Sequence, residues 1–228
     1  MSTQQLDPAG DSARGNEPAS GNELSIVGRS SSHYTRLARI FAAELGISYS
    51  FQIVHDILST NPEDYAGNPA LKVPALRTNS GAWFGALNIC RELARRSKSG
   101  LRVLWPEDLR YPLLANAQEL TFQAMTTEVA LIMGKVAAES GAQAPANLGK
   151  MRSSLANSMA WLDEEAPNLW EALPERDLSV LEVSLFCLVE HLEFREILPT
   201  SPYSNLIEFC RVFKARPSAQ QTSYRFDR

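Results

Sequence analysis

The run from Gly67 to Leu76, G-N-P-A-L-K-V-P-A-L, limits the possible folds of this chain more than any other feature. Its glycine, asparagine and prolines interrupt regular structure, so it predicts a turn that leads through the Val73-Pro74 bond into a short strand. A second run, G-R-S-S-S-H-Y-T-R-L-A-R, extends from Gly28 to Arg39 and predicts a serine-rich turn at the head of a helix.

Periodicity supplies the elements around these two runs. Strands are expected at 24–27, 48–54, 74–77 and 82–84, and helices at 34–45 and 86–96. Gly46 follows the first helix as a C′ glycine, and Asn79-Ser80-Gly81 forms a hairpin turn. The order is β-α-β and then β-β-α.

The second half of the chain shows only helical periodicity. Helices are expected at 111–138, at 146–165, from 179 onward and at 203–215, with a last short turn or helix from 216. Ser179 and Glu182 stand in the positions of a capping box, in which each side chain satisfies a backbone N–H of the other residue.

Composition excludes several classes of protein. The 228 residues are 44% hydrophobic and 21% charged with a net charge of −4, which is ordinary for a globular protein and unlike a nucleic-acid-binding one. Cys90, Cys187 and Cys210 are widely spaced and include no C-x-x-C, which favours a reducing, cytoplasmic setting. No apolar run is long enough for a membrane span, and no secretory signal is expected at the N-terminus.

Four local patterns, taken in order, resemble the soluble (cytosolic) glutathione transferases. They are Gly28–Arg36, the N-P-x-x-K-V-P of Asn68–Pro74, Ser179–Phe186, and the A-R-P-S of Ala215–Ser218. The resemblance implies an α/β thioredoxin-like N-terminal domain followed by an all-α C-terminal domain. The expected division is a disordered tail at 1–22, a thioredoxin-like domain at 23–98, a linker at 99–110 and an all-helical domain at 111–228.

The resemblance implies that Ser32 is the catalytic residue, whose hydroxyl donates to the glutathione sulfur while the helix N-terminus favours the thiolate. Ser30 and Ser31 are alternatives if the turn differs by one residue. The simpler interpretation is that Ser32 is only an N-cap and that His33 is a solvent-facing residue of the first turn.

The resemblance implies that the Val73-Pro74 bond is cis and that Val73 offers its main chain to the cysteinyl part of glutathione. The simpler interpretation is an ordinary trans proline that opens an edge strand. Gly85-Ala86 stands where the family usually has an acidic residue or glutamine followed by serine, so Ala86 is the expected contact for the γ-glutamyl end. Neither side chain can form a hydrogen bond, although backbone N–H groups at the helix start, and Asn88 in part, are possible substitutes.

His191-Leu192-Glu193 has the H-x-E form of zinc deaminases, but no cysteine pair or second histidine lies at ligand spacing. We therefore expect a cluster on a helix surface and no metal. Cys90 and Cys187 are expected to be inert core residues.

The resemblance implies a glutathione-transferase-like protein that conjugates glutathione, its substrate, to a small electrophile bound between the domains near Tyr111. It further implies a cytoplasmic homodimer with no nucleic-acid or membrane partner. The alternative, which Gly85 and Ala86 favour, is a non-catalytic binding or interaction protein with a degenerate glutathione site.

Overall fold

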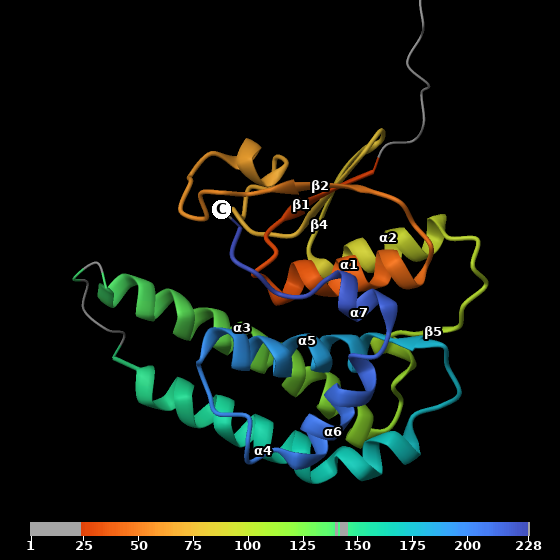
Figure 1. Cartoon of the computed structure of the whole chain (residues 1–228), viewed down its shortest axis with the longest axis vertical. Helices are drawn as coiled ribbons and strands as arrows, with labels where there is room; N and C mark the ends of the chain where they lie inside the picture. Colours follow the sequence, from red (N-terminus) through yellow and green to blue (C-terminus); the bar gives the residue numbers. More distant parts are fainter. Residues whose placement is uncertain (1–23, 140, 142–145, 228) are drawn as a thin grey trace, which may run out of the picture.

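The computed structural model of this chain describes residues 24–139, 141 and 146–227, so the tail expected at 1–22 lies outside the described residues. The sheet lies at one end of the molecule, two helices cover one of its faces, and most of the remaining helices lie beyond these two (Figure 1). This arrangement confirms the predicted α/β domain followed by an all-α domain.

The sheet has four strands in the order β2-β1-β3-β4. They are β1 (Ser25–Gly28), β2 (Ser50–Ile53), β3 (Ala75–Thr78) and β4 (Gly81–Phe84). β1 and β2 are parallel and are connected by α1 (His33–Glu44), whereas β3 is antiparallel to both β1 and β4. α2 (Ala86–Arg96) follows β4, as predicted.

Alternating side chains cover the two faces of the sheet. Ile26 and Leu76 belong to the main core with α1, α2 and the helical domain. Their neighbours Val27 and Ala75 point to the opposite face and pack with Tyr65 of the short helix η1 (Pro62–Tyr65). The central strands β1 and β3 therefore contribute buried side chains to both faces of the sheet.

The helical domain begins after η2 (Pro106–Asp108) and contains five helices among its described residues. They are α3 (Pro112–Glu139), α4 (Leu148–Ala172), α5 (Val180–Arg195), α6 (Ser204–Phe213) and α7 (Pro217–Gln221). α3 packs against α4 and α5, and α5 packs against α1, so α5 joins the two domains. Figure 1 shows α1 lying directly on this helix.

Three details differ from the predicted elements. β5 (Val103–Leu104) pairs in parallel with β6 (Leu178–Ser179), although only helices were expected in the second half. α4 continues through Pro167 to Ala172 because Ala166 and Leu169 are fully buried. At the start of α5, Ser179 accepts from the Glu182 N–H at 3.0 Å as predicted, whereas the Glu182 carboxylate meets the Ser179 hydroxyl at 2.7 Å instead of a backbone N–H.

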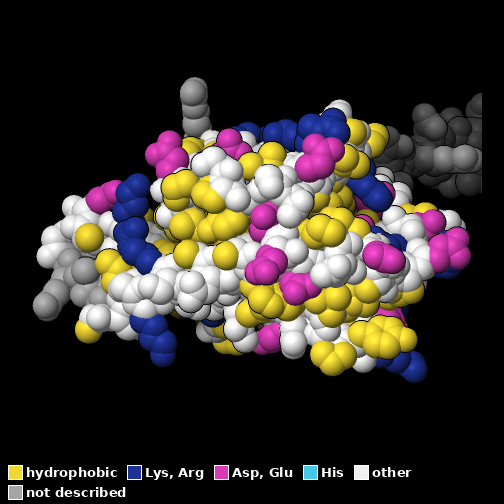
Figure 2. All heavy atoms as spheres, turned by 90° about the horizontal axis from the view of Figure 1, so that it is seen from below, with side chains coloured by type: hydrophobic (Ala, Val, Ile, Leu, Met, Phe, Trp, Pro, Cys, Tyr) yellow, Lys and Arg dark blue, Asp and Glu magenta, His cyan; other side chains and the backbone are white. Residues whose placement is uncertain are grey.

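The surface below the helical domain carries scattered hydrophobic side chains, with lysine and arginine mainly toward its edges (Figure 2). This face has no continuous basic patch for an anionic macromolecule. Among the described residues, no helix combines the length and the hydropathy that crossing a membrane requires.

Candidate functional site

The sheet register brings the predicted site residues to one end of the sheet. Val27 lies opposite Ala75, and Ala75 lies opposite Phe84. Extending both pairings by one residue places Pro74 between Gly28 and Gly85, and the Gly85 N–H donates to the Pro74 carbonyl at 3.3 Å. The Ser32 turn, the Val73-Pro74 bond and the start of α2 are therefore neighbours.

Ser32 is the N-cap of α1. Its Oγ accepts from the Thr35 N–H at 3.2 Å. A hydroxyl that accepts this bond still has its own proton to donate, so the capping role and a ligand-binding role are compatible. Ser32 is half-buried, whereas Ser30 and Ser31 are 2% and 8% exposed. Of the three serines, Ser32 is best able to meet a ligand.

The turn depends on a close approach of β1 and α1 at Gly28. A Cβ on this residue would lie 2.6 Å from both Oγ1 and Cγ2 of Thr35. A larger residue at Gly28 would therefore force Thr35 to shift, and the Thr35 N–H is the group that the Ser32 side chain caps.

Val73-Pro74 is a cis peptide bond, as predicted. Val73 is half-buried, and its main-chain N–H and C=O form no hydrogen bond with the described residues. Backbone groups require hydrogen-bond partners, and an extended peptide can supply both a donor and an acceptor. Val73 can therefore pair with a peptide-like ligand.

α2 begins at the Gly85-Ala86 pair. Gly85 is its N-cap with φ +83° and no side-chain capping bond, and Ala86 is 7% exposed. The start of this 11-residue helix therefore offers a ligand its backbone N–H groups and the positive end of its dipole. Asn88, which was considered as a substitute donor, is exposed in the first turn.

Beneath the Ser32 turn, buried side chains from three helices meet. Glu128 of α3 accepts at Oε2 from Nδ1 of His33 in α1, at 3.0 Å. Its Oε1 lies 2.8 Å from Nδ1 of His191 in α5. Nε2 of His191 lies 2.8 Å from the Ser31 carbonyl oxygen. This cluster connects the helical domain directly to the turn.

The interpretation of both histidines from the sequence is wrong. His33 is 1% exposed rather than solvent-facing, and His191 is 2% exposed rather than part of a surface cluster. The fold supplies the second histidine that sequence spacing did not reveal. One signal was present: Glu128 follows Ala117, Thr121 and Ala124 at helical spacing, so a carboxylate lies on the buried face of α3.

Hydrogen bonds and burial together set the pKa values of Glu128 and His33. Burial alone would raise the pKa of Glu128, but hydrogen bonds from His191 and His33 hold this pKa below its ordinary value. Burial lowers the pKa of His33, which favours a neutral ring that donates its Nδ1–H to Glu128. Nε2 of His33 has no partner among the described residues.

These three side chains offer ligand atoms within 4.8 Å of one another, so they are close enough to hold a metal ion. However, both oxygens of Glu128 already accept hydrogen bonds from the imidazoles. The positive charge of Arg195 also acts on His33 and Glu128, which opposes a further cation. The donor set fits a hydrogen-bonded charge pair better than a metal site.

Arg36 adds a buried cation beside the cluster. It is 2% exposed, and its guanidinium lies over the ring of Phe186 at 4.7 Å and over that of Tyr224 at 4.3 Å. Its Nη2 donates to the Ala219 carbonyl at 3.2 Å. Stacking between two rings is possible for a planar guanidinium and not for an ammonium group, so Arg36 holds α1 against α5 in a way that lysine could not.

Residues 223–227, which follow α7 and its C-cap Thr222, form a C-terminal segment that crosses the start of α1 and ends beside the N-terminal domain (Figure 1). The Tyr224 hydroxyl donates to the Cys187 carbonyl at 2.7 Å. Asp227 accepts from the Ser30 N–H at 2.8 Å. This contact, which local spacing in the sequence does not reveal, places a carboxylate at the turn.

The cysteines are all buried, as expected for Cys90 and Cys187. Burial raises the pKa of Cys187 to about 12 and raises the pKa of Cys90 well above its ordinary value. Burial also raises the pKa of Cys210. None of the three thiols is therefore ionised near neutral pH, which excludes them as nucleophiles.

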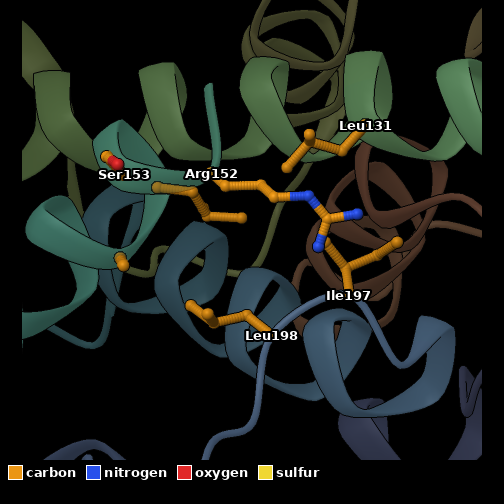
Figure 3. A pocket seen from close by; sticks show the side chains of 7 residues that line it. Leu131, Arg152, Ser153, Ile197 and Leu198 are labelled. Atoms are coloured by element: carbon orange, nitrogen blue, oxygen red, sulfur yellow. The ribbon is translucent and has the colours of Figure 1, made fainter. Parts of the chain in front are cut away.

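Two surface pockets lie away from the Ser32 turn. The first, of about 350 Å³, lies between α3, α4 and the residues after α5, and Arg152 points across it toward Ile197 (Figure 3). The second, of about 330 Å³, lies where α1 meets Tyr49 and Thr222. Tyr111, which was expected near a second ligand, is 69% exposed and lines neither pocket.

Comparison with known proteins places this geometry in context. Residues 31–96 match the family model described as glutathione S-transferase, N-terminal domain. No curated protein matches the sequence. A glutathione S-transferase from Methylobacillus flagellatus KT, solved with GSH bound, is 21% identical with a TM-score of 0.72, over 89% of this chain and 100% of that one.

Two further solved structures are similar. A glutathione S-transferase from Methylobacterium radiotolerans JCM 2831, in complex with glutathione sulfonate, is 20% identical with a TM-score of 0.66, over 90% of this chain and 97% of that one. A glutathione transferase family member from Pseudomonas fluorescens Pf-5, with bound glutathione, is 18% identical with a TM-score of 0.67, over 89% of this chain and 100% of that one. These similarities establish the fold of the whole described chain.

Proposed function

We infer that this chain, which has the fold of the glutathione transferases and whose residues 31–96 match the N-terminal domain of that family, binds glutathione at the end of its sheet. The observation that carries this proposal is a convergence. Three features lie side by side: a half-buried serine at a helix N-terminus, a Val73 main chain that is unpaired within the described part of the chain, and the open start of α2. A thiol peptide needs these three kinds of contact.

In the proposed reaction, the sulfur of glutathione lies at the N-terminus of α1. The Ser32 hydroxyl donates to the sulfur while its oxygen continues to accept from Thr35. The N–H groups of the first turn and the helix dipole favour the thiolate over the thiol. The thiolate then attacks a small electrophile, and the leaving group departs with its electron pair. Val73 and the start of α2 hold the peptide in position.

A second candidate function has its own support. The side chains of Gly85 and Ala86 supply no hydrogen bond at the start of α2, and the Asp227 carboxylate lies at the turn where a thiolate is proposed. A protein with these features would keep the fold while binding glutathione weakly and transferring nothing. This non-catalytic binding or interaction role is the alternative.

Calorimetric titration with glutathione, followed by turnover of a chlorinated dinitrobenzene, separates the two functions. If the chain is a transferase, we expect saturable binding of glutathione and release of chloride from the electrophile. Ser32→Ala should then lower kcat by about 10- to 100-fold, because it removes a hydrogen bond to a charged sulfur worth about 1.5–3 kcal/mol. Ser30→Ala is the matched control and should change kcat little. Equal losses in the two variants would exclude Ser32 as the activating residue, and absent binding would favour the alternative.

Assembly and location are also proposals. A homodimer is supported by a face of α3 on which Val129, Met133 and Val136 are 38%, 37% and 39% exposed, because stripes of this kind are often covered by a second subunit. A cytoplasmic location is supported by three cysteines that are all buried and unpaired.

A further inference from the structure

The two ring nitrogens of His191 both face oxygen atoms. Nε2 lies 2.8 Å from the Ser31 carbonyl oxygen, and Nδ1 lies 2.8 Å from Oε1 of Glu128. A carbonyl oxygen can only accept a hydrogen bond, so Nε2 must carry a proton. A neutral imidazole has only one N–H, and this bond already uses it.

Glu128 decides the state of the other nitrogen. Its Oε2 accepts from Nδ1 of His33, and the positive charge of Arg195 favours the ionised form of this buried carboxyl. An ionised carboxylate is an acceptor only, so the short contact with His191 requires a proton on Nδ1 as well. His191 is therefore an imidazolium ion, and Glu128 neutralises it.

The positive ring of His191 donates a hydrogen bond to Ser31, the residue that precedes Ser32. Ser31 is 8% exposed, and its carbonyl oxygen points inward to His191. On the other side of the same peptide, the Ser32 N–H donates to the Arg29 carbonyl at 3.2 Å. In a trans peptide the C=O and N–H point in opposite directions, so this peptide is held at both edges and cannot turn its oxygen toward a ligand.

We propose that His191 is a positioning residue for thiol activation. Its imidazolium holds the Ser31 carbonyl away from the sulfur and so keeps the Ser32 hydroxyl and the first N–H groups of α1 aimed at the thiolate. This inference rests on the proposed function. Without His191, the negative end of the Ser31 peptide could turn toward the sulfur and oppose the thiolate.

Other titratable or charged groups also face His191 or its partners, and they contribute to the pH dependence of the thiolate titration and of kcat. They are His33 and Arg36 of α1, Cys187 and Arg195 of α5, and Tyr224 of the C-terminal segment. None of them contacts the Ser31 carbonyl through a hydrogen bond among the described residues, so substitution of His191 tests this contact specifically.

The test uses two substitutions in the full chain. In His191→Gln the side chain keeps an N–H donor for Ser31 and loses the charge. In His191→Met both the donor and the charge are lost. The readout is the ultraviolet absorbance of the bound glutathione thiolate, measured as a function of pH. The constants kcat and KM are measured alongside it. His55→Gln is the control, because His55 is exposed.

For His191→Met we expect about tenfold lower kcat near neutral pH and a thiolate titration displaced to higher pH, since one charged hydrogen bond is worth about that much. KM should change little, and His191→Gln should recover part of the loss. An unchanged thiolate titration in a folded His191→Met that binds glutathione would overturn the proposal. So would one equivalent of metal in the purified protein that is absent from His191→Met.

A second measurement decides the inference even if the wild-type chain does not bind glutathione. Nitrogen-15 spectra of the histidine rings report the protonation of both nitrogens of His191 directly. Two protonated nitrogens, together with altered amide shifts at Ser31 and Ser32 in His191→Gln, support the contact. A neutral ring in the folded protein overturns it, whereas absent glutathione binding alone would count against the proposed function.

Discussion

Glu128 carries a negative charge in a place where almost no water can stabilise it. The residue is fully buried, and the two imidazoles that bond to it replace the lost hydration. Removing one partner of such a set is costly because the others are left buried and unpaired. The turn above the cluster therefore depends on three side chains that lie far apart in the sequence.

The contribution of His33 to the stability of this chain should fall in mild acid. Burial lowers the pKa of His33 in the folded state, so below its ordinary value of 6.5 the unfolded chain binds a proton that the folded chain resists. The contribution of His33 is complete above pH 6.5 and is lost as the pH falls through the folded value. Thermal unfolding between about pH 7 and 5 is the measurement.

His33→Gln should flatten this dependence. The variant should be less stable by about 1–3 kcal/mol near pH 7, because a glutamine side chain fills the space of the buried imidazole less well, yet it should lose less further stability on acidification. His55→Gln, at an exposed position, should behave as the wild type does. A His33→Gln profile parallel to that of the wild type would show that His33 does not titrate differently on folding.

At the scale of elements, the N-termini of α1 and α2 differ in the groups that they present to a ligand. α1 has a side-chain cap at Ser32, whereas α2 begins at Gly85 with no capping side chain. Both helix ends lie at the same end of the sheet, so their dipoles act on the same ligand. The weaker of the two sites is the start of α2, and a single hydroxyl can change it.

Ala86→Ser should tighten glutathione binding by about tenfold, the worth of one recovered hydrogen bond to a charged group. Titration calorimetry measures it, with Ala82→Ser on the exposed part of β4 as the control. Gly85→Glu is a poorer choice because φ at Gly85 is +83°, where a side chain costs about 1–3 kcal/mol. No gain from Ala86→Ser would indicate that the ligand does not reach α2.

The elements were largely predictable because they rest on local patterns. Gly46 lies at φ +66°, as a C′ glycine requires, and the Val73-Pro74 bond is cis. The pairing of β5 with β6 was not predictable, since strands of two residues have no periodicity to detect. The burial of Glu128 was not predicted either, since a carboxylate takes the buried position on α3 while its neighbour Val129 is 38% exposed.

The candidate site likewise contains residues that local patterns predicted and residues that they did not. Ser32, Val73, Pro74 and Ala86 were placed by motifs, and the sheet register brings them together as a neighbouring set. The contacts of His191 and Asp227 with the turn join residues 160 and 197 positions apart. Local spacing contains no information about such pairs, so only the folded chain shows them.

At the scale of the whole molecule, the two domains are held together by α5 and α1 and by the C-terminal segment. Polar contacts from α3 and α5 and stacking on Arg36 occupy the interface. The outer face of α3 remains uncovered at Val129, Met133 and Val136. This face is where a second copy of the chain is expected.

Met133→Glu should shift the protein from dimer to monomer, since it places a charge in the middle of an apolar contact. Sedimentation velocity at micromolar concentration measures the shift. Gln123→Glu adds the same charge at an exposed position elsewhere on α3 and is the control. A wild-type chain that sediments as a monomer would exclude the dimer, and a dimeric Met133→Glu would place the interface on another face.

The position of Asp227 has a practical side. Its carboxylate contacts the Ser30 N–H, so a peptide attached shortly after Asp227 would begin beside the turn that carries Ser32. An affinity tag or a fluorescent protein at this end would compete with any molecule that approaches the turn, or would pull the carboxylate away from it. Rates and affinities measured on such fusions would then describe the tag as much as the protein, so a cleavable tag at the other end is the better design.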